Sequence, residues 1–221
     1  MEARSVRIDV GSVEEGKSRF IEGDLALSSL RECMVVFAHG SGSSRFSPRN
    51  RFVASALHNA GLSTLLLDLL TREEDAIDSL TGRYRFDVEL LASRLVDAVR
   101  WLEGEYGSNL RIGYFGSSTG AASALIAYAR YPDNVRAIVS RGGRVDLAAH
   151  YLQSIKVPTL LIVGGYDTTV LRLNREAMDM FPRDCMVRLE VIPDATHLFE
   201  EPGALEQVAD KARDWFLKHL P

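Results

Sequence analysis

The sequence contains few cysteines and no long apolar runs. Only two cysteines occur among the 221 residues, and both Cys33 and Cys185 lie in apolar stretches far apart along the chain. This pattern favours buried free thiols over a disulfide framework or a metal cluster, and it is typical of a reducing compartment. The apolar runs are no longer than a strand, and the first ten residues lack a basic start followed by an apolar stretch. We therefore expect a cytoplasmic protein without a signal peptide or a membrane span.

The charge is also close to balanced. The formal net charge is -4 and the sequence pI is about 5.8, which gives no reason to expect nucleic acid or a membrane surface as the partner. Hydrophobic residues make up 46% and charged residues 25%, as in ordinary globular proteins. The length predicts a single domain over residues 1–221. No pattern in the sequence indicates an oligomeric state.

Short apolar runs alternate with longer segments of helical period, which predicts an α/β protein with a mostly parallel sheet covered by helices on both faces. Strands are expected at residues 6–10, 19–27, 33–38, 62–67, 110–115, 137–140, 159–163 and 186–192, the first two as an antiparallel pair. Helices are expected at residues 48–60, 87–106, 118–131, 169–180 and 203–220. The polar stretch 71–87 is interpreted as a surface excursion at the loop-bearing edge of the sheet.

One motif carries the clearest chemical signal. The residues Gly116-Ser117-Ser118-Thr119-Gly120 match G-x-S-x-G, and they follow a strand and open a helix. Such a turn holds its middle serine outward from the sheet, and small neighbours let the strand and helix approach each other. We therefore predict Ser118 as a nucleophile. The alternative is a glycine-rich and serine-rich turn that binds a phosphate or has no chemical role.

A nucleophilic serine needs a base and an acid that orients the base, and in this kind of fold they follow in the order serine, acid, histidine. Asp167 comes after the strand at 159–163 and two glycines, and His197 follows the last strand. These two residues are the predicted acid and base. Asp194 and Asp68 are rival acids, and His150 is a histidine that could also approach the site.

A second glycine-rich turn, His39-Gly40-Ser41-Gly42, follows the strand at 33–38. Its backbone N–H groups are candidates for an oxyanion hole. We predict that the N–H of Ser41 and the N–H of Thr119 form this hole, and that one such donor lowers the barrier by about 3 to 4 kcal/mol. His39 is interpreted as a brace for the turn. A phosphate-binding loop is the competing interpretation, but neither of its usual glycine patterns is present.

Together these motifs resemble the α/β-hydrolase superfamily, and within it the dienelactone-hydrolase-like branch. The resemblance covers nearly the whole chain and implies an α/β-hydrolase fold with a sheet of about eight strands. It also implies hydrolysis of esters, lactones or related acyl compounds through an acyl-enzyme. Dienelactone hydrolases usually carry cysteine where this chain has Ser118, so the serine favours ordinary esterase behaviour.

Arginines near the loop-bearing edge are candidates for substrate binding. Arg141 and Arg144 flank two glycines after the strand at 137–140, and a guanidinium there could bind a substrate carboxylate. The alternative is a surface arginine paired with an acid. The cluster Arg45, Arg49 and Arg51 is a further candidate. Only residues 141–158 separate two strands where related folds insert a cap, so no large cap is expected.

These observations predict a serine hydrolase that cleaves small carboxylic esters through an acyl-enzyme on Ser118, with no cofactor and no metal. The expected partner is a small-molecule ester. One alternative keeps the same three residues but uses a lactone, dienelactone or thioester. Another is a catalytically inert binding protein on a hydrolase scaffold.

Overall fold

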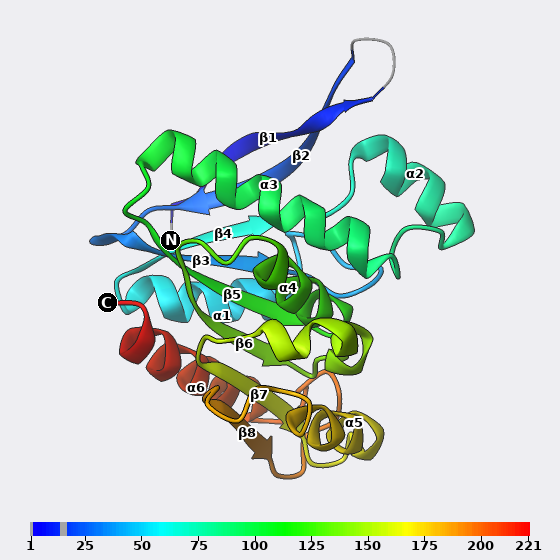
Figure 1. The fold of residues 1–221 in the computed structure, drawn as a ribbon, viewed down its shortest axis with the longest axis vertical. Coiled ribbons are helices and arrows are strands. Elements are labelled where there is room, and N and C mark those ends of the chain that lie inside the picture. Colours follow the sequence, from blue (N-terminus) through cyan, green and yellow to red (C-terminus); the bar gives the residue numbers. More distant parts are fainter. Residues whose placement is uncertain (1, 14–16) are drawn as a thin grey trace.

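The chain folds around a sheet of eight strands in the order β1-β2-β4-β3-β5-β6-β7-β8. The computed structural model describes residues 2–13 and 17–221. The strands are β1 (Arg4–Val13), β2 (Lys17–Ala26), β3 (Leu30–Ala38), β4 (Leu62–Leu67), β5 (Arg111–Ser117), β6 (Val135–Arg141), β7 (Thr159–Gly164) and β8 (Val187–Ile192) (Figure 1). The pairs β1·β2 and β2·β4 are antiparallel, and all other pairs are parallel. The expected mostly parallel sheet with an antiparallel opening pair is confirmed.

Helices cover both faces of this sheet, as predicted. One face carries α1 (Pro48–Asn59) and α6 (Ala204–His219), which pack against each other. The other face carries α3 (Val88–Tyr106), α4 (Thr119–Arg130), the 3-10 segment η1 (Val145–Ser154) and α5 (Thr168–Met178) (Figure 1). Because parallel strands are buried on both faces, they are apolar along their whole length. Every residue of β4 and β7 is accordingly buried.

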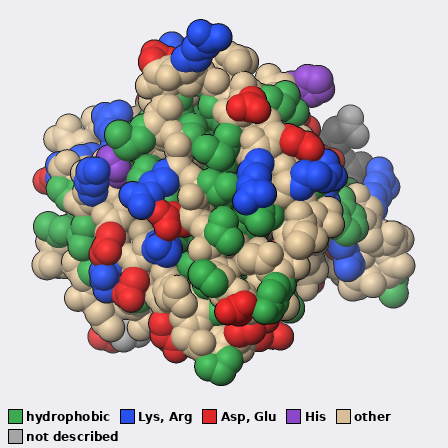
Figure 2. All heavy atoms as spheres, turned by 90° about the horizontal axis from the view of Figure 1, so that it is seen from below, with side chains coloured by type: hydrophobic (Ala, Val, Ile, Leu, Met, Phe, Trp, Pro, Cys, Tyr) green, Lys and Arg blue, Asp and Glu red, His purple; other side chains and the backbone are tan. Residues whose placement is uncertain are grey.

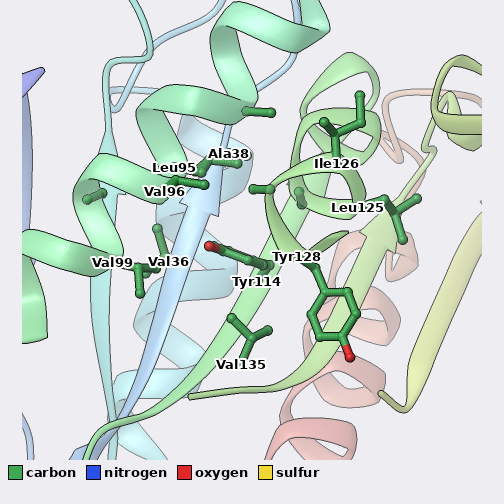
Figure 3. Packing of buried hydrophobic residues seen from close by; sticks show 14 of the residues in the cluster. Val36, Ala38, Leu95, Val96, Val99, Tyr114, Leu125, Ile126, Tyr128 and Val135 are labelled. Atoms are coloured by element: carbon green, nitrogen blue, oxygen red, sulfur yellow. The ribbon is translucent and has the colours of Figure 1, made fainter. Parts of the chain in front are cut away.

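The larger core lies between α3, α4 and the sheet (Figure 3). Val36 of β3 and Tyr114 of β5 face Leu95 and Val99 of α3 in this core. The apolar residues of α3 recur at steps of three and four, so one stripe of the helix is buried. This packing fixes the carboxyl ends of β3 and β5, where the two glycine-rich turns begin.

The region between residues 71 and 87 is more regular than predicted. It contains the helix α2 (Arg72–Thr81). The side chain of Thr71 accepts a hydrogen bond from the Glu74 N–H, and the Glu74 carboxylate accepts one from the Thr71 N–H. The sequence contains the Thr-x-x-Glu pattern of this capping box, and Gly82 ends the helix in the left-handed region.

Between β6 and β7 the chain forms only η1, so the absence of a large cap is confirmed.

Charges of both signs are interspersed on the face that Figure 2 shows, with apolar side chains scattered between them. None of the helices within the described ranges is both long and apolar enough to cross a membrane. Among the same residues, no cluster of three or more His, Cys, Asp or Glu side chains could hold a metal ion. Both cysteines are free thiols.

Candidate active site

Ser118 sits on a sharp turn between β5 and α4. Its backbone has φ 52° and ψ -120°, a conformation that non-glycine residues rarely adopt. The flanking glycines make the turn possible. A Cβ on Gly116 would lie 2.4 Å from Ala121 Cα, and a Cβ on Gly120 would lie 2.3 Å from the Ala38 carbonyl oxygen. The G-x-S-x-G spacing therefore follows from close backbone approach on both sides of the serine.

The backbone of Ser118 is held by the loop after β6. The Ser118 N–H donates to the Arg141 carbonyl oxygen at 3.1 Å, and the Arg144 N–H donates to the Ser118 carbonyl oxygen at 3.0 Å. Two hydrogen bonds from one loop thus support the unusual backbone conformation.

His197 and Asp167 are brought together from separate loops. The His197 Nδ1 lies 2.6 Å from the Asp167 Oδ2. Asp167 follows β7 and is the N-cap of α5, where it also accepts a hydrogen bond from the Val170 N–H at 3.4 Å. Because the carboxylate only accepts, the proton of the imidazole is on Nδ1, and the lone pair on Nε2 is available as a base.

The rival acids are engaged elsewhere. Asp194 accepts a hydrogen bond from the Tyr166 hydroxyl at 2.7 Å. Asp68 accepts the Arg45 N–H at 2.8 Å and pairs with the guanidinium of the same residue. His150 lies exposed in η1. Asp167 is therefore the acid that contacts the predicted base.

Ser118 and His197 line the same hollow, which has a volume of about 260 Å³. Its wall is formed by Gly40, Ser41, Ser43, Ser47, Arg49, Asn50, Ser117, Ser118, Arg141, His197 and Leu198. A larger hollow of about 430 Å³ is also lined by the turn after β3, and the two hollows share Gly40, Ser41 and Ser43. The larger hollow has a mixed lining of acids, arginines and apolar side chains.

The predicted oxyanion donors lie next to each other, although one of them is already engaged. The Ser41 N–H donates to the Thr119 Oγ1 at 2.9 Å. The Thr119 N–H belongs to the first residue of α4, where backbone N–H groups have no acceptor within the helix. The hydroxyl of Thr119 thus connects the turn after β3 to the helix that follows Ser118.

His39 braces the same turn. Its Nε2 accepts the Leu69 N–H at 3.2 Å, and its Nδ1 lies 2.8 Å from the Gly40 carbonyl oxygen. Burial lowers the pKa of His39 below its ordinary value, because the charged form is poorly solvated in the interior. These contacts agree with the structural role expected for this histidine.

Most of the candidate arginines are paired with acids. Arg144 makes two hydrogen bonds to Asp146, at 2.9 and 2.8 Å. Arg45 pairs with Glu22, Asp24 and Asp68, Arg51 pairs with Asp24, and Arg49 pairs with Glu200. The surface ion pair is therefore the correct interpretation for Arg144.

Arg141 differs from the other candidates. It is buried, it lines the hollow beside Ser118, and it has no salt bridge within the described part of the chain. Its Nη2 donates to the Asn50 Oδ1 at 3.4 Å, and the same oxygen accepts the Ser117 hydroxyl at 2.8 Å. Asn50 could not be predicted from the sequence, because its partners lie on segments that are distant along the chain.

The arrangement combines a serine on a strand-to-helix turn and an imidazole whose Nδ1 lies beside a carboxylate oxygen. On this sheet, with helices on both faces and no large cap, it defines an α/β-hydrolase. The chain belongs to the dienelactone hydrolase family, whose model matches residues 30–219.

Similar proteins support this assignment. A crystal structure of a dienelactone hydrolase from Anabaena variabilis is 50% identical, with a TM-score of 0.93 over 100% of this chain and 99% of that chain. An esterase of Pyrococcus furiosus shares the fold at 19% identity and a TM-score of 0.77, over 100% of this chain and 92% of that chain. A Mycobacterium tuberculosis protein with the provisional name of phosphoribosyl transferase is 55% identical over 201 residues. That match covers 90% of this chain and 44% of the relative, so the chain spans less than half the relative's length.

Proposed function

We propose that the chain is a serine hydrolase that cleaves small carboxylic esters through an acyl-enzyme on Ser118. The observation that carries this proposal is the lining of one hollow by Ser118 and by His197, whose Nδ1 lies 2.6 Å from Asp167. A hydroxyl, a base and an orienting carboxylate are the groups that acyl transfer needs.

In the first half of the reaction, Ser118 Oγ attacks the ester carbonyl carbon and its proton passes to His197 Nε2. The carbonyl oxygen becomes an oxyanion, which accepts hydrogen bonds from the N–H groups of Thr119 and Ser41. The Ser41 N–H donates to the Thr119 hydroxyl at 2.9 Å in the free protein, so its use as an oxyanion donor requires this hydrogen bond to be released. The C–O bond to the alcohol then breaks, and His197 returns the proton to the leaving oxygen.

In the second half, water replaces the alcohol. His197 takes a proton from the water, whose oxygen attacks the acyl carbon, and the tetrahedral intermediate expels Ser118 Oγ. The histidine returns the proton to the serine, and the carboxylic acid leaves. Asp167 stays ionised throughout and stabilises the imidazolium that forms in each half.

The volume of the site favours small substrates. The hollow at Ser118 is about 260 Å³, which is below the usual range for drug-sized ligands. No large cap covers it, since only η1 lies between β6 and β7. Short acyl groups and accessible esters therefore fit the site better than long lipids.

A lactone is the second candidate substrate. The dienelactone hydrolase name of the Anabaena variabilis relative, at 50% identity, favours it. The same three residues would open a ring instead of releasing a separate alcohol. The phosphoribosyl transfer named for the Mycobacterium tuberculosis relative is not assigned to this chain, because the match covers only 44% of that protein.

A fluorophosphonate probe tests the nucleophile. We expect the wild type and Ser117→Ala to be labelled and Ser118→Ala to remain unlabelled, since Ser117 is a buried neighbour in the same turn. An unlabelled wild type would favour the inert scaffold. Steady-state rates on a panel of small esters and lactones then separate the two substrate classes.

A further inference from the structure

Asn174 is a buried polar residue that lines neither hollow. It lies in α5, and its exposed fraction is 0%. Its Nδ2 donates two hydrogen bonds of 2.8 Å, one to the Val170 carbonyl oxygen in the same helix and one to the Gly143 carbonyl oxygen in the loop after β6. Both neighbours are acceptors, so the nitrogen of the amide must face them. The side chain of Asn174 therefore connects α5 to this loop.

Stability alone does not account for this amide. The Asn174 Oδ1 is buried and has no hydrogen-bond partner within the part of the chain that the structure describes. A buried acceptor without a donor costs free energy comparable with what a hydrogen bond contributes. The gain from the two Nδ2 hydrogen bonds is thus offset in part, and the amide is distinguished by the place where it holds the loop.

The loop that Asn174 contacts touches both the predicted nucleophile and the predicted base. The Arg144 N–H donates to the Ser118 carbonyl oxygen at 3.0 Å. Gly142 lies against the imidazole, since a Cβ on this glycine would lie 3.3 Å from the His197 Cε1 and Nδ1. Gly143, between these two contacts, packs too closely against α4 and β6 to hold a Cβ. The position of the Gly143 peptide therefore affects both sides of the proton transfer.

The helix that carries Asn174 also carries the predicted acid. Asp167 is the N-cap of α5, Val170 follows three residues later and Asn174 a further four, and these steps place the three residues on one face of the helix. The Asp167 carboxylate accepts the Val170 N–H at 3.4 Å, and Asn174 donates to the carbonyl oxygen of the same residue at 2.8 Å. The helix thus contacts His197 through Asp167 and the loop through Asn174.

Building on the proposed function, we infer that Asn174 is a positioning residue for acyl transfer. Its hydrogen bond to Gly143 fixes the loop after β6 relative to α5, and so fixes Ser118 relative to His197 and Asp167. Loss of this bond leaves every reacting group present but lets the distance from the serine hydroxyl to the imidazole vary. A displacement of about 1 Å in such a site lowers the rate by about 100-fold.

Two substitutions test this role. Asn174→Leu removes both hydrogen bonds, whereas Asn174→Thr keeps a hydroxyl that can donate to the Val170 carbonyl oxygen, four residues back in the helix, but is too short to reach Gly143. With a small 4-nitrophenyl ester, we expect both variants to lower kcat by about 10- to 100-fold. KM should change by less than about twofold, because Asn174 lines neither hollow. The matched control, Ala177→Gly, weakens the same helix at a buried position and leaves the amide in place, so its kcat should equal that of wild type.

The rate of fluorophosphonate labelling at Ser118 gives a second readout and should decrease in parallel with kcat. Urea unfolding shows that each variant is folded under the assay conditions, and Asn174→Thr decides the question if Asn174→Leu does not fold. The inference is overturned if the Asn174 variants keep the kcat of wild type, if only their KM changes, or if Ala177→Gly loses as much kcat as they do. An unlabelled wild type would instead refute the proposed esterase, and the inference with it.

Discussion

Replacement of Arg141 by methionine should make the protein more stable. Methionine is unbranched and of similar length, so it can fill the space of the arginine stem without a buried charge. The Asn50 Oδ1 keeps its hydrogen bond from the Ser117 hydroxyl at 2.8 Å, so the substitution leaves no new buried acceptor without a donor. The gain in stability comes from removal of a buried guanidinium that pairs with no acid among the residues that the structure describes.

The magnitude follows from the pKa of Arg141. Burial lowers the pKa of Arg141 well below its ordinary value, to about 10, and this decrease corresponds to about 3 kcal/mol of unfavourable free energy for the charged form at neutral pH. The lost contacts to Phe199 and Asn50, at 5.9 and 3.4 Å, offset about 1 kcal/mol of this gain. The net expectation is about 2 kcal/mol, and a chain of this size should show a rise of roughly 4 to 8 °C in the thermal midpoint.

Differential scanning calorimetry or urea unfolding at pH 7 measures this change. The control Arg144→Met removes an ion pair with Asp146 on a partly exposed side chain and should change stability by less than about 1 kcal/mol. A lower midpoint for Arg141→Met than for wild type would refute the reasoning, because it would mean that the buried guanidinium stabilises the fold.

Three further predictions concern the site and its support. Asp167→Asn should lower kcat by about 10⁴-fold, because an amide no longer fixes the imidazole tautomer, whereas Asp194→Asn should have little effect in the same ester assay. Gly116→Ala should destabilise the fold by about 3 kcal/mol or more in urea unfolding, since its Cβ would lie 2.4 Å from the α4 backbone. Gly104→Ala, in an open position of α3, should instead stabilise by about 0.5 to 1 kcal/mol. Burial lowers the pKa of His39, so the unfolded chain binds a proton that the folded protein does not. The contribution of His39 to the free energy of unfolding should be complete above about pH 6.5 and should decrease below it by up to about 1.4 kcal/mol per pH unit. For His39→Gln, the free energy of unfolding should decrease less steeply between about pH 7.5 and 5.

The sequence was sufficient where function depends on local backbone geometry. The G-x-S-x-G turn was predictable because the close approach of strand and helix requires glycine at Gly116 and Gly120, which leaves a direct trace in the residue types. The positions of Asp167 and His197 after two strands were predictable because parallel strands end at the same edge of the sheet.

The sequence was insufficient where the role of a residue depends on its partner. Arg141 and Arg144 look equivalent along the chain, but one is buried without an acid and the other pairs with Asp146. The helix α2 was missed because its polar composition outweighed a short capping signal at Thr71 and Glu74. Asn50 carried no pattern at all, since its contacts join α1 to the ends of β5 and β6.

In the loop after β6, the backbone and the side chain of Arg141 have separate roles. The peptide carbonyl of Arg141 accepts a hydrogen bond from the Ser118 N–H at 3.1 Å, while its side chain lines the hollow beside Ser118. A substitution at this position can therefore change the wall of the hollow, while the backbone of the loop continues to hold Ser118. An insertion or deletion between residues 141 and 144 would disturb both tasks at once, so homologues should vary here by substitution and keep the loop length constant.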